Sequence, residues 1–117
     1  MTGASGRRSV WSAGEEAAAG WYQEHGYEVV ARNWRCRHGE IDLIARRGRL
    51  LVFCEVKART SDAFGSPLEA VTPTKQARLR RLAATWLEQA GGSGPGPIRF
   101  DVAAVLGGQV EVVENAF

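Results

Sequence analysis

Apolar side chains recur at helical spacing in the second half of the chain. They are Leu79, Leu82, Ala83, Trp86, Leu87 and Ala90. Their intervals of three and four residues are typical of one face of a helix. Thr72 followed by Pro73 has the order of an N-cap and a first helical proline. We therefore expect a helix that begins after Thr72 and ends at the glycine pair Gly91-Gly92.

A further helix is predicted near the start of the chain. Ser12 and Glu15 have the spacing of a capping box, in which the two side chains satisfy free backbone N–H groups. Gly26 offers a C-terminal stop for this helix. Residues 1–11 show no periodicity, so we expect a flexible N-terminal tail there and a single domain over residues 12–117.

Runs rich in β-branched and apolar residues predict five strands. They cover Tyr27–Cys36, Glu40–Ala45, Leu50–Ala58, Ile98–Leu106 and Gln109–Glu114. The second and third flank the short segment Arg46–Arg49, which favours an antiparallel hairpin. The long connection from the third strand through a helix to the fourth is typical of a parallel pair. The sequence therefore predicts an α/β fold in the order α-β-β-β-α-β-β, with helices covering a mixed β-sheet.

Composition narrows the class of protein. The chain has 117 residues, of which 44% are hydrophobic, and this fits one globular domain. No apolar run reaches the roughly 18 residues of a membrane span, and Cys36 and Cys54 form no CxxC pattern. We therefore expect a soluble cytoplasmic protein with no membrane partner. The formal charge of +2 is too small to indicate a nucleic-acid partner by itself.

Two charged residues end the apolar third strand. Glu55 and Lys57 follow five apolar residues, and both lie on one face because side chains alternate along a strand. Withdrawing an ion from water is costly unless it is paired or bound to a metal. These side chains therefore need a partner or an open cleft. One interpretation is an ion pair at the frayed end of a strand.

Asp42 interrupts an apolar run in the second strand in the same way. If the hairpin loop has an even number of residues, Asp42 and Glu55 lie on the same face, directly opposite or diagonal to each other. An odd loop would place them on opposite faces. Asp42 capping a bend is the structural alternative.

Two carboxylates in a partly desolvated site repel each other unless a cation is present. The formal charge of Asp42, Glu55 and Lys57 together is −1. Glu15 from the first helix would make it −2, which suits Mg²⁺ with carboxylate and water ligands. The capping box is an equally complete explanation of Glu15. With Lys57 reaching toward a water or an anionic substrate, the set has the parts that metal-assisted phosphodiester hydrolysis requires.

Several motifs that occur in order resemble the YraN family of predicted endonucleases. They are Gly14-Glu15-Glu16-Ala17-Ala18, Gly26-Tyr27, Ala31-Arg32-Asn33-Trp34-Arg35, Gly39-Glu40-Ile41-Asp42-Leu43-Ile44-Ala45, Phe53-Cys54-Glu55-Val56-Lys57-Ala58-Arg59, Glu69-Ala70-Val71-Thr72 with Lys75-Gln76, and Arg99-Phe100-Asp101-Val102. The resemblance spans about residue 12 to 106. An isolated D…ExK pattern would be common by chance, whereas an ordered series of motifs is specific.

That family is similar to the PD-(D/E)xK superfamily, which includes restriction endonucleases and archaeal-type Holliday-junction resolvases. The resemblance implies a restriction-endonuclease-like fold and a Mg²⁺-dependent endonuclease, with Mn²⁺ as a substitute, that acts on DNA, branched or damaged structures included. Ile41 stands where the superfamily's motif has proline, and Cys54 where valine is more usual.

The resemblance also implies roles for individual residues. Asp42, Glu55 and Lys57 become the catalytic core, and Glu15 the acidic residue carried by a helix. Gln76 or Lys75 becomes an auxiliary residue at the start of the second helix. The backbone carbonyl of Val56 would bind the metal beside Asp42 and Glu55.

Two groups of basic residues are candidates for binding phosphates. One is Lys75, Arg78 and Arg81 on the second helix, and the other is Arg46, Arg47 and Arg49 at the hairpin turn. A solvated face explains any one of them, but both groups together with a metal site favour nucleic acid, DNA ahead of RNA. A resolvase-like function would also call for a homodimer. Two alternatives are a non-catalytic nucleic-acid-binding module on a nuclease fold and an interaction protein whose acidic pocket is only structural.

Overall fold

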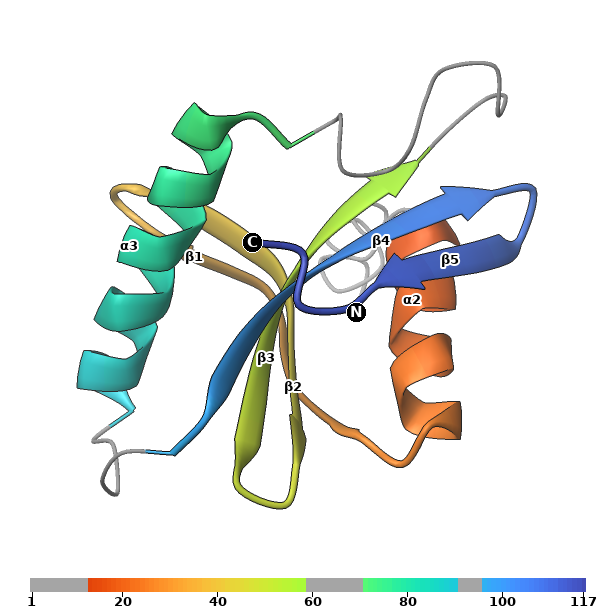
Figure 1. Ribbon diagram of the computed structural model, residues 1–117, viewed down its shortest axis with the longest axis horizontal. Helices are drawn as coiled ribbons and strands as arrows, with labels where there is room; N and C mark the ends of the chain where they lie inside the picture. The colour runs from red at the N-terminus through yellow and green to blue at the C-terminus, as the bar shows by residue number, and fades with distance from the viewer. Residues whose placement is uncertain (1–12, 59–70, 91–95) are drawn as a thin grey trace, which may run out of the picture.

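A computed structural model of the chain describes residues 13–58, 71–90 and 96–117. The predicted tail, the cap residue Ser12 and the Gly91-Gly92 stop lie outside the described residues. Within them the chain forms two helices and one sheet (Figure 1). The predicted α/β fold is therefore confirmed. No helix of the described part is long and apolar enough to cross a membrane.

Five strands form one mixed sheet, in the order β1-β2-β3-β4-β5. They are β1 (Glu28–Cys36), β2 (Gly39–Arg47), β3 (Leu50–Ala58), β4 (Ile98–Leu106) and β5 (Gln109–Val113). The strands β3 and β4 are parallel, and the other neighbours are antiparallel. The predicted parallel pair and the predicted hairpin are both confirmed.

The predicted end of the second strand at Ala45 was wrong. The strand β2 continues through Arg46, which pairs with Leu51, to Arg47, which pairs with Leu50. Arg46 also reaches across to β1, where its Nη2 donates to Oε1 of Glu28 at 2.9 Å. Two exposed arginines therefore extend the ladder, and the loop is shorter than predicted.

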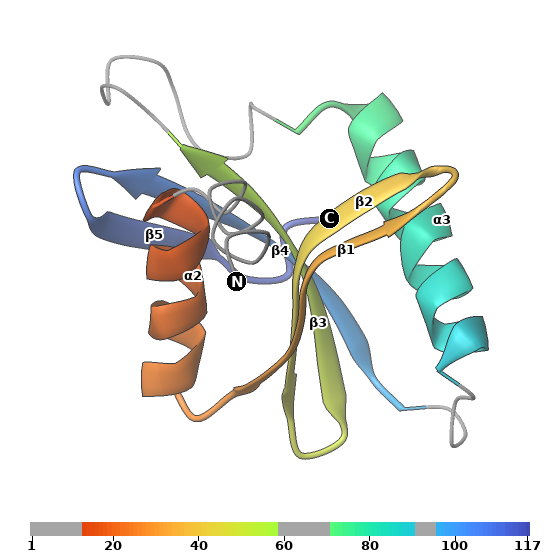
Figure 2. The ribbon, with the colours of Figure 1, turned by 180° about the vertical axis from the view of Figure 1, so that it is seen from behind.

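Two helices, α2 (Ala13–Glu24) and α3 (Pro73–Gln89), cover opposite faces of the sheet (Figure 2). Val52 and Cys54 belong to the apolar cluster under α2, whereas Phe53 belongs to the cluster under α3. This separation follows from the alternation of side chains along β3. The α2 cluster also contains Ala18, Ala19, Tyr22, Tyr27, Leu43, Ala45 and Ala103, and the α3 cluster Ile41, Ile44, Leu79, Leu82, Ala83 and Phe100.

The predicted start of α3 is confirmed. The Thr72 hydroxyl oxygen accepts from the backbone N–H of Lys75 at 3.3 Å, and Pro73 is the first helical residue. This bond satisfies one of the N–H groups that a helix leaves free at its start. The cap therefore fixes the residue at which α3 begins and places Lys75 in its first turn.

Asp101 is a fully buried charged residue on β4, and its carboxylate accepts hydrogen bonds from three parts of the chain. It accepts from the Tyr22 hydroxyl at 2.6 Å, from the Arg99 guanidinium at 2.9 Å and from the backbone N–H of Asn115 at 3.0 Å. A buried carboxylate is tolerated when it is paired and hydrogen-bonded in this way. Asp101 therefore connects α2, β4 and the segment after β5.

The sheet separates between β2 and β3 beyond one point. Their ladder ends at the pair Leu43 and Cys54. Past it β2 stays paired with β1 as far as Gly39, while β3 stays paired with β4 as far as Ala58. Figure 1 shows the two pairs of strands turning apart, with β1 and β2 directed toward α3. Asp42 and Glu55 are the first residues beyond this separation.

Candidate active site

The register of β2 and β3 places Asp42 and Glu55 on one face. Gly48 and Arg49 form a two-residue loop, because Arg47 pairs with Leu50. The loop is therefore even, and continuing the register by one residue from Leu43 and Cys54 sets Asp42 opposite Glu55. The even-loop case of the prediction therefore applies, and in that case the two carboxylates share a face.

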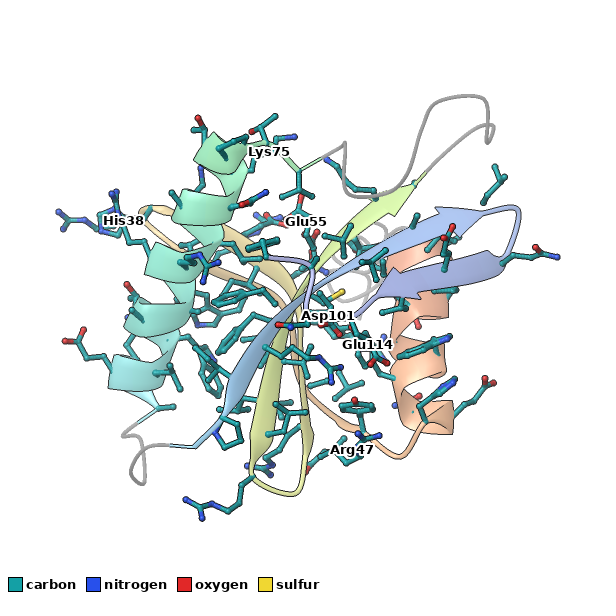
Figure 3. The ribbon with its side chains drawn as sticks, in the orientation of Figure 1. His38, Arg47, Glu55, Lys75, Asp101 and Glu114 are labelled. Carbon is teal, nitrogen blue, oxygen red and sulfur yellow. The ribbon has the colours of Figure 1, made fainter. Side chains whose placement is uncertain are left out.

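Both carboxylates line a cavity of about 160 Å³. Its lining residues are Glu40, Asp42, Glu55, Lys75, Arg78, Leu79 and Leu82. The strands β2 and β3 supply the acidic side chains, and the first half of α3 supplies the basic and apolar ones. Figure 3 shows Glu55 near the end of α3 that carries Lys75. The cavity is therefore lined by acidic side chains from the sheet and by basic side chains from α3.

A third and a fourth carboxylate approach Asp42. Carboxylate oxygens of Glu15, Glu40 and Asp42 all lie within 4.8 Å of one another. Glu15 comes from α2, which packs on the other face of the sheet, and the separation of β2 from β3 leaves it a path to Asp42. Sequence reasoning named Glu15 and missed Glu40. Glu40 precedes Asp42 by two residues on the same strand, and this alternation was the signal that could have found it.

The environment of Asp42 favours its protonated form. Burial, together with the charges of Glu55, Glu15 and Glu40, raises the pKa of the Asp42 carboxyl to about 7, although a hydrogen bond to this carboxylate acts in the opposite direction. In that bond the backbone N–H of Val56 donates to Oδ2 of Asp42 at 2.9 Å. It crosses the gap where the β2–β3 ladder has ended, so it also fixes the direction of the carboxylate. The alternative that Asp42 caps a bend does not describe this arrangement.

Lys57 forms an ion pair with Glu55, with Nζ and Oε2 3.7 Å apart. The strand is not frayed here, because Lys57 and Ala58 remain paired with β4. Lys75 lies beside Lys57, and the charge of Lys57 is the main cause of a lowered pKa at Lys75. Two ammonium groups thus lie together at the edge of the cavity and attract an anion.

The other predicted site residues divide by position. Gln76 does not line the cavity, and its Nε2 donates to the carbonyl oxygen of Val71 at 3.1 Å. The carboxylate Oε1 of Glu15 accepts from Nδ2 of Asn33 at 3.3 Å. The capping-box explanation of Glu15 depends on Ser12, which lies outside the described residues.

The two predicted basic groups are far apart. Lys75 and Arg78 line the cavity, and Arg81 lies one helical turn further along α3. Arg47 is the last residue of β2 and lies about 17 Å from Asp42 at the usual rise of a strand. Figure 3 shows Arg47 at the opposite end of the sheet from Glu55. Nη1 of Arg47 donates to the carbonyl oxygen of His25, and its guanidinium lies 4.4 Å from the ring centroid of Tyr27. The structure thus brings the α3 group to the cavity and leaves Arg46 and Arg47 outside it.

Comparison with known proteins gives the family. The chain matches the Uncharacterised protein family UPF0102 over residues 14–105, a span that includes every residue of the cavity. It is 50% identical over 114 residues to a UPF0102 protein of Mycolicibacterium vanbaalenii, covering 97% of this chain and 93% of the relative. It is 47% identical over 128 residues to one of Acidothermus cellulolyticus, covering 97% of each. A relative in Streptomyces griseus is 55% identical over 93 residues, covering 80% of this chain and 78% of the relative. The chain therefore belongs to the UPF0102 family.

Proposed function

We propose that this protein is a Mg²⁺-dependent endonuclease that hydrolyses phosphodiester bonds of DNA on a restriction-endonuclease-like fold. The observation that carries the proposal is the cavity lined by Asp42, Glu55 and Lys75, with Lys57 forming an ion pair with Glu55. Carboxylates that repel each other need a cation, and lysines beside them suit an anion. A metal ion and a phosphate together satisfy both requirements.

The residues of the cavity fit a divalent cation. The raised pKa of Asp42 reflects burial and neighbouring carboxylates, and a bound cation would offset both. Carboxylate oxygens are the donors that Mg²⁺ and Mn²⁺ prefer. Asp42 and Glu55 would hold the ion, and Glu15 and Glu40, whose carboxylate oxygens lie within 4.8 Å of that of Asp42, are further candidates for ligands. When bound, Mg²⁺ would polarise a phosphoryl oxygen and lower the pKa of a coordinated water.

The backbone of Val56 is suited to the same task. In an extended strand the N–H and C=O groups of one residue point to the same side. Because the N–H of Val56 points at Asp42, the carbonyl is also directed toward β2. No β2 residue pairs with Val56 in the described ladder. The carbonyl oxygen is therefore suited to be a third protein ligand, as the family resemblance implies.

Each side chain in the cavity, and Lys57 beside it, has a separate role in the proposed reaction. Asp42 is held in one orientation by the Val56 N–H, so it is organised before substrate arrives. Lys57, held near Glu55, stabilises the negative charge that develops on the phosphoryl oxygens. Lys75 and Arg78, both on α3, bind phosphates next to the reacting one. Water attacks phosphorus in line with the leaving oxygen, so one P–O bond forms while the opposite one breaks, and water's protons end on the solvent and the leaving oxygen.

The proposal is tested by cleavage of a panel of labelled DNA substrates. Single-stranded, duplex, flap and four-way-junction DNA are incubated with the protein in Mg²⁺ or Mn²⁺. Asp42→Asn and Lys57→Ala should each lower the rate about 100-fold or more. Glu111→Gln, which removes an exposed carboxylate on β5, is the matched control and should keep the wild-type rate.

Three outcomes distinguish the interpretations. Loss of cleavage in both site variants and not in the control supports the endonuclease. Cleavage that persists in both site variants indicates a contaminating nuclease and contradicts the proposal. Binding without cleavage in either metal supports the alternative function, a non-catalytic nucleic-acid-binding module. Lys75, Arg78 and Arg81 on α3 would bind nucleic acid equally well in such a module.

A further inference from the structure

The turn between β1 and β2 rests on α3 at the edge of the cavity. Cys36 pairs with Gly39, so Arg37 and His38 are the two loop residues. A Cβ atom added to Gly39 would lie 3.6 Å from Cδ of Arg78 and 3.5 Å from Cδ1 of Leu82. Gly39 also has a φ of +142°, which other residues rarely adopt. The turn is therefore held close against α3, and Figure 2 shows the β1–β2 hairpin crossing that helix.

This region carries arginines without acidic partners. Within the described residues Arg37, Arg78 and Arg81 form no ion pair, and all three are exposed. Arg35 and Arg46, in contrast, are paired with Glu40 and Glu28. Exposed guanidinium groups that are not neutralised from within the protein are suited to an external anion, and their planar donors match phosphate oxygens.

We propose that Arg37 and His38, together with Arg78 and Arg81, form a turn–helix surface that binds the nucleic-acid backbone next to the cleavage site. This inference rests on the proposed function. Arg78 belongs to the cavity and also contacts the region of the turn, so the surface is continuous with the site. A strand whose reacting phosphate lies in the cavity therefore carries its flanking phosphates onto this surface.

The size of the surface indicates a polymer as the partner. Lys75 and Arg81 are six residues apart on α3, which is about 9 Å along a helix axis. Phosphates of one strand of duplex DNA recur about every 3.4 Å along its axis. The basic residues of α3, Lys75, Arg78 and Arg81, thus span more than one phosphate. Arg37 and His38 of the turn extend this length further. We expect tight binding of an oligonucleotide and weak binding of a single nucleotide.

The test measures binding in the Asp42→Asn background with Mg²⁺, so that the substrate is not cleaved. Anisotropy of a labelled duplex is followed at salt concentrations from about 50 to 200 mM. Arg37→Gln and Arg81→Gln should each reduce the magnitude of the salt slope by about 0.9, because each variant neutralises one phosphate fewer. The control Arg80→Gln removes the same charge from α3. Because the Arg80 guanidinium lies over the rings of Phe100 and Phe117, the slope should not change.

The outcomes separate this inference from the proposed function. If the Arg37 and Arg81 variants behave like Arg80→Gln while the duplex still binds, the turn–helix surface is overturned and the endonuclease stands. If only the Arg81 variant changes the slope, the turn is excluded from the interface. If neither the duplex nor single-stranded, flap or four-way-junction DNA binds, both proposals fail. Competition by polyglutamate as strong as by unlabelled duplex would identify an acidic protein as the partner and overturn the inference.

Discussion

Replacing Asp42 by asparagine should stabilise the protein when no metal is present. Burial and three neighbouring carboxylates raise the pKa of this carboxyl from 3.8 to about 7 in the folded state. A group whose folded pKa lies above its unfolded value binds more protons in the folded state, so stability falls as pH rises between the two values. At about pH 8 the charged Asp42 therefore costs folding free energy. Asparagine removes the charge and keeps an oxygen for the Val56 N–H.

The stabilisation expected for Asp42→Asn can be calculated from the raised pKa of Asp42. An increase from 3.8 to about 7 corresponds to about 4 kcal/mol of folding free energy, at 1.36 kcal/mol for each pH unit. Asp42 is half-buried, and solvent screening at an open cavity reduces this to roughly 2 kcal/mol. For a domain of this size that is an increase in Tm of about 5–10 °C.

Thermal unfolding followed by circular dichroism measures the effect of Asp42→Asn without metal and the stabilisation by Mg²⁺. In EDTA at about pH 8, Asp42→Asn should unfold at a higher temperature than the wild type, and the difference should vanish near pH 4. With Mg²⁺ at about 100 times its Kd the wild type should gain about 2.7 kcal/mol, and Asp42→Asn should gain little. A lower Tm for Asp42→Asn than for the wild type in EDTA, or an equal gain in stability from Mg²⁺ in both proteins, would contradict this prediction.

Three further changes test other parts of the structure. Glu40→Gln should weaken Mg²⁺ binding about tenfold in calorimetry, because it removes a carboxylate beside Asp42, and an unchanged Kd would exclude Glu40 from the site. Asp101→Asn should cost about 3–5 kcal/mol in urea unfolding, since Arg99 would lose its buried partner; a cost below about 1 kcal/mol would contradict the structural role. Gly39→Ala should destabilise the protein by about 1–3 kcal/mol through its positive φ, whereas the control Gly20→Ala in α2, where nothing lies within 4 Å, should stabilise it by about 0.5–1 kcal/mol. Equal effects of the two glycine changes would remove the argument for a fixed turn.

The elements that could be predicted from sequence are those with strong local signals. The period of Leu79 and Leu82, with the cap at Thr72 and Pro73, located α3 to within a residue at its start. The charge of Asp42 in an apolar run identified the site because few structures tolerate it without a partner. Because side chains alternate along β2 and β3, whether Asp42 and Glu55 share a face depended only on whether the loop between the strands has an even number of residues.

Features that depend on the third dimension could not be predicted in the same way. The separation of β2 from β3 has no local signature, yet it leaves the path by which Glu15 reaches Asp42 from the other layer. The proximity of Lys75 to Lys57 depends on how α3 packs over the end of β3. Arg46 and Arg47 looked suited to phosphates because their partners Glu28 and His25 lie on other segments of the chain.

Anomalous X-ray scattering from a crystal soaked in Mn²⁺ tests the metal site most directly. We expect a peak bounded by the carboxylates of Asp42 and Glu55, and we expect this peak to be absent from a crystal of Asp42→Asn. No peak at this position, at a Mn²⁺ concentration that supports cleavage in solution, would contradict it. So would a peak that persists unchanged in the variant.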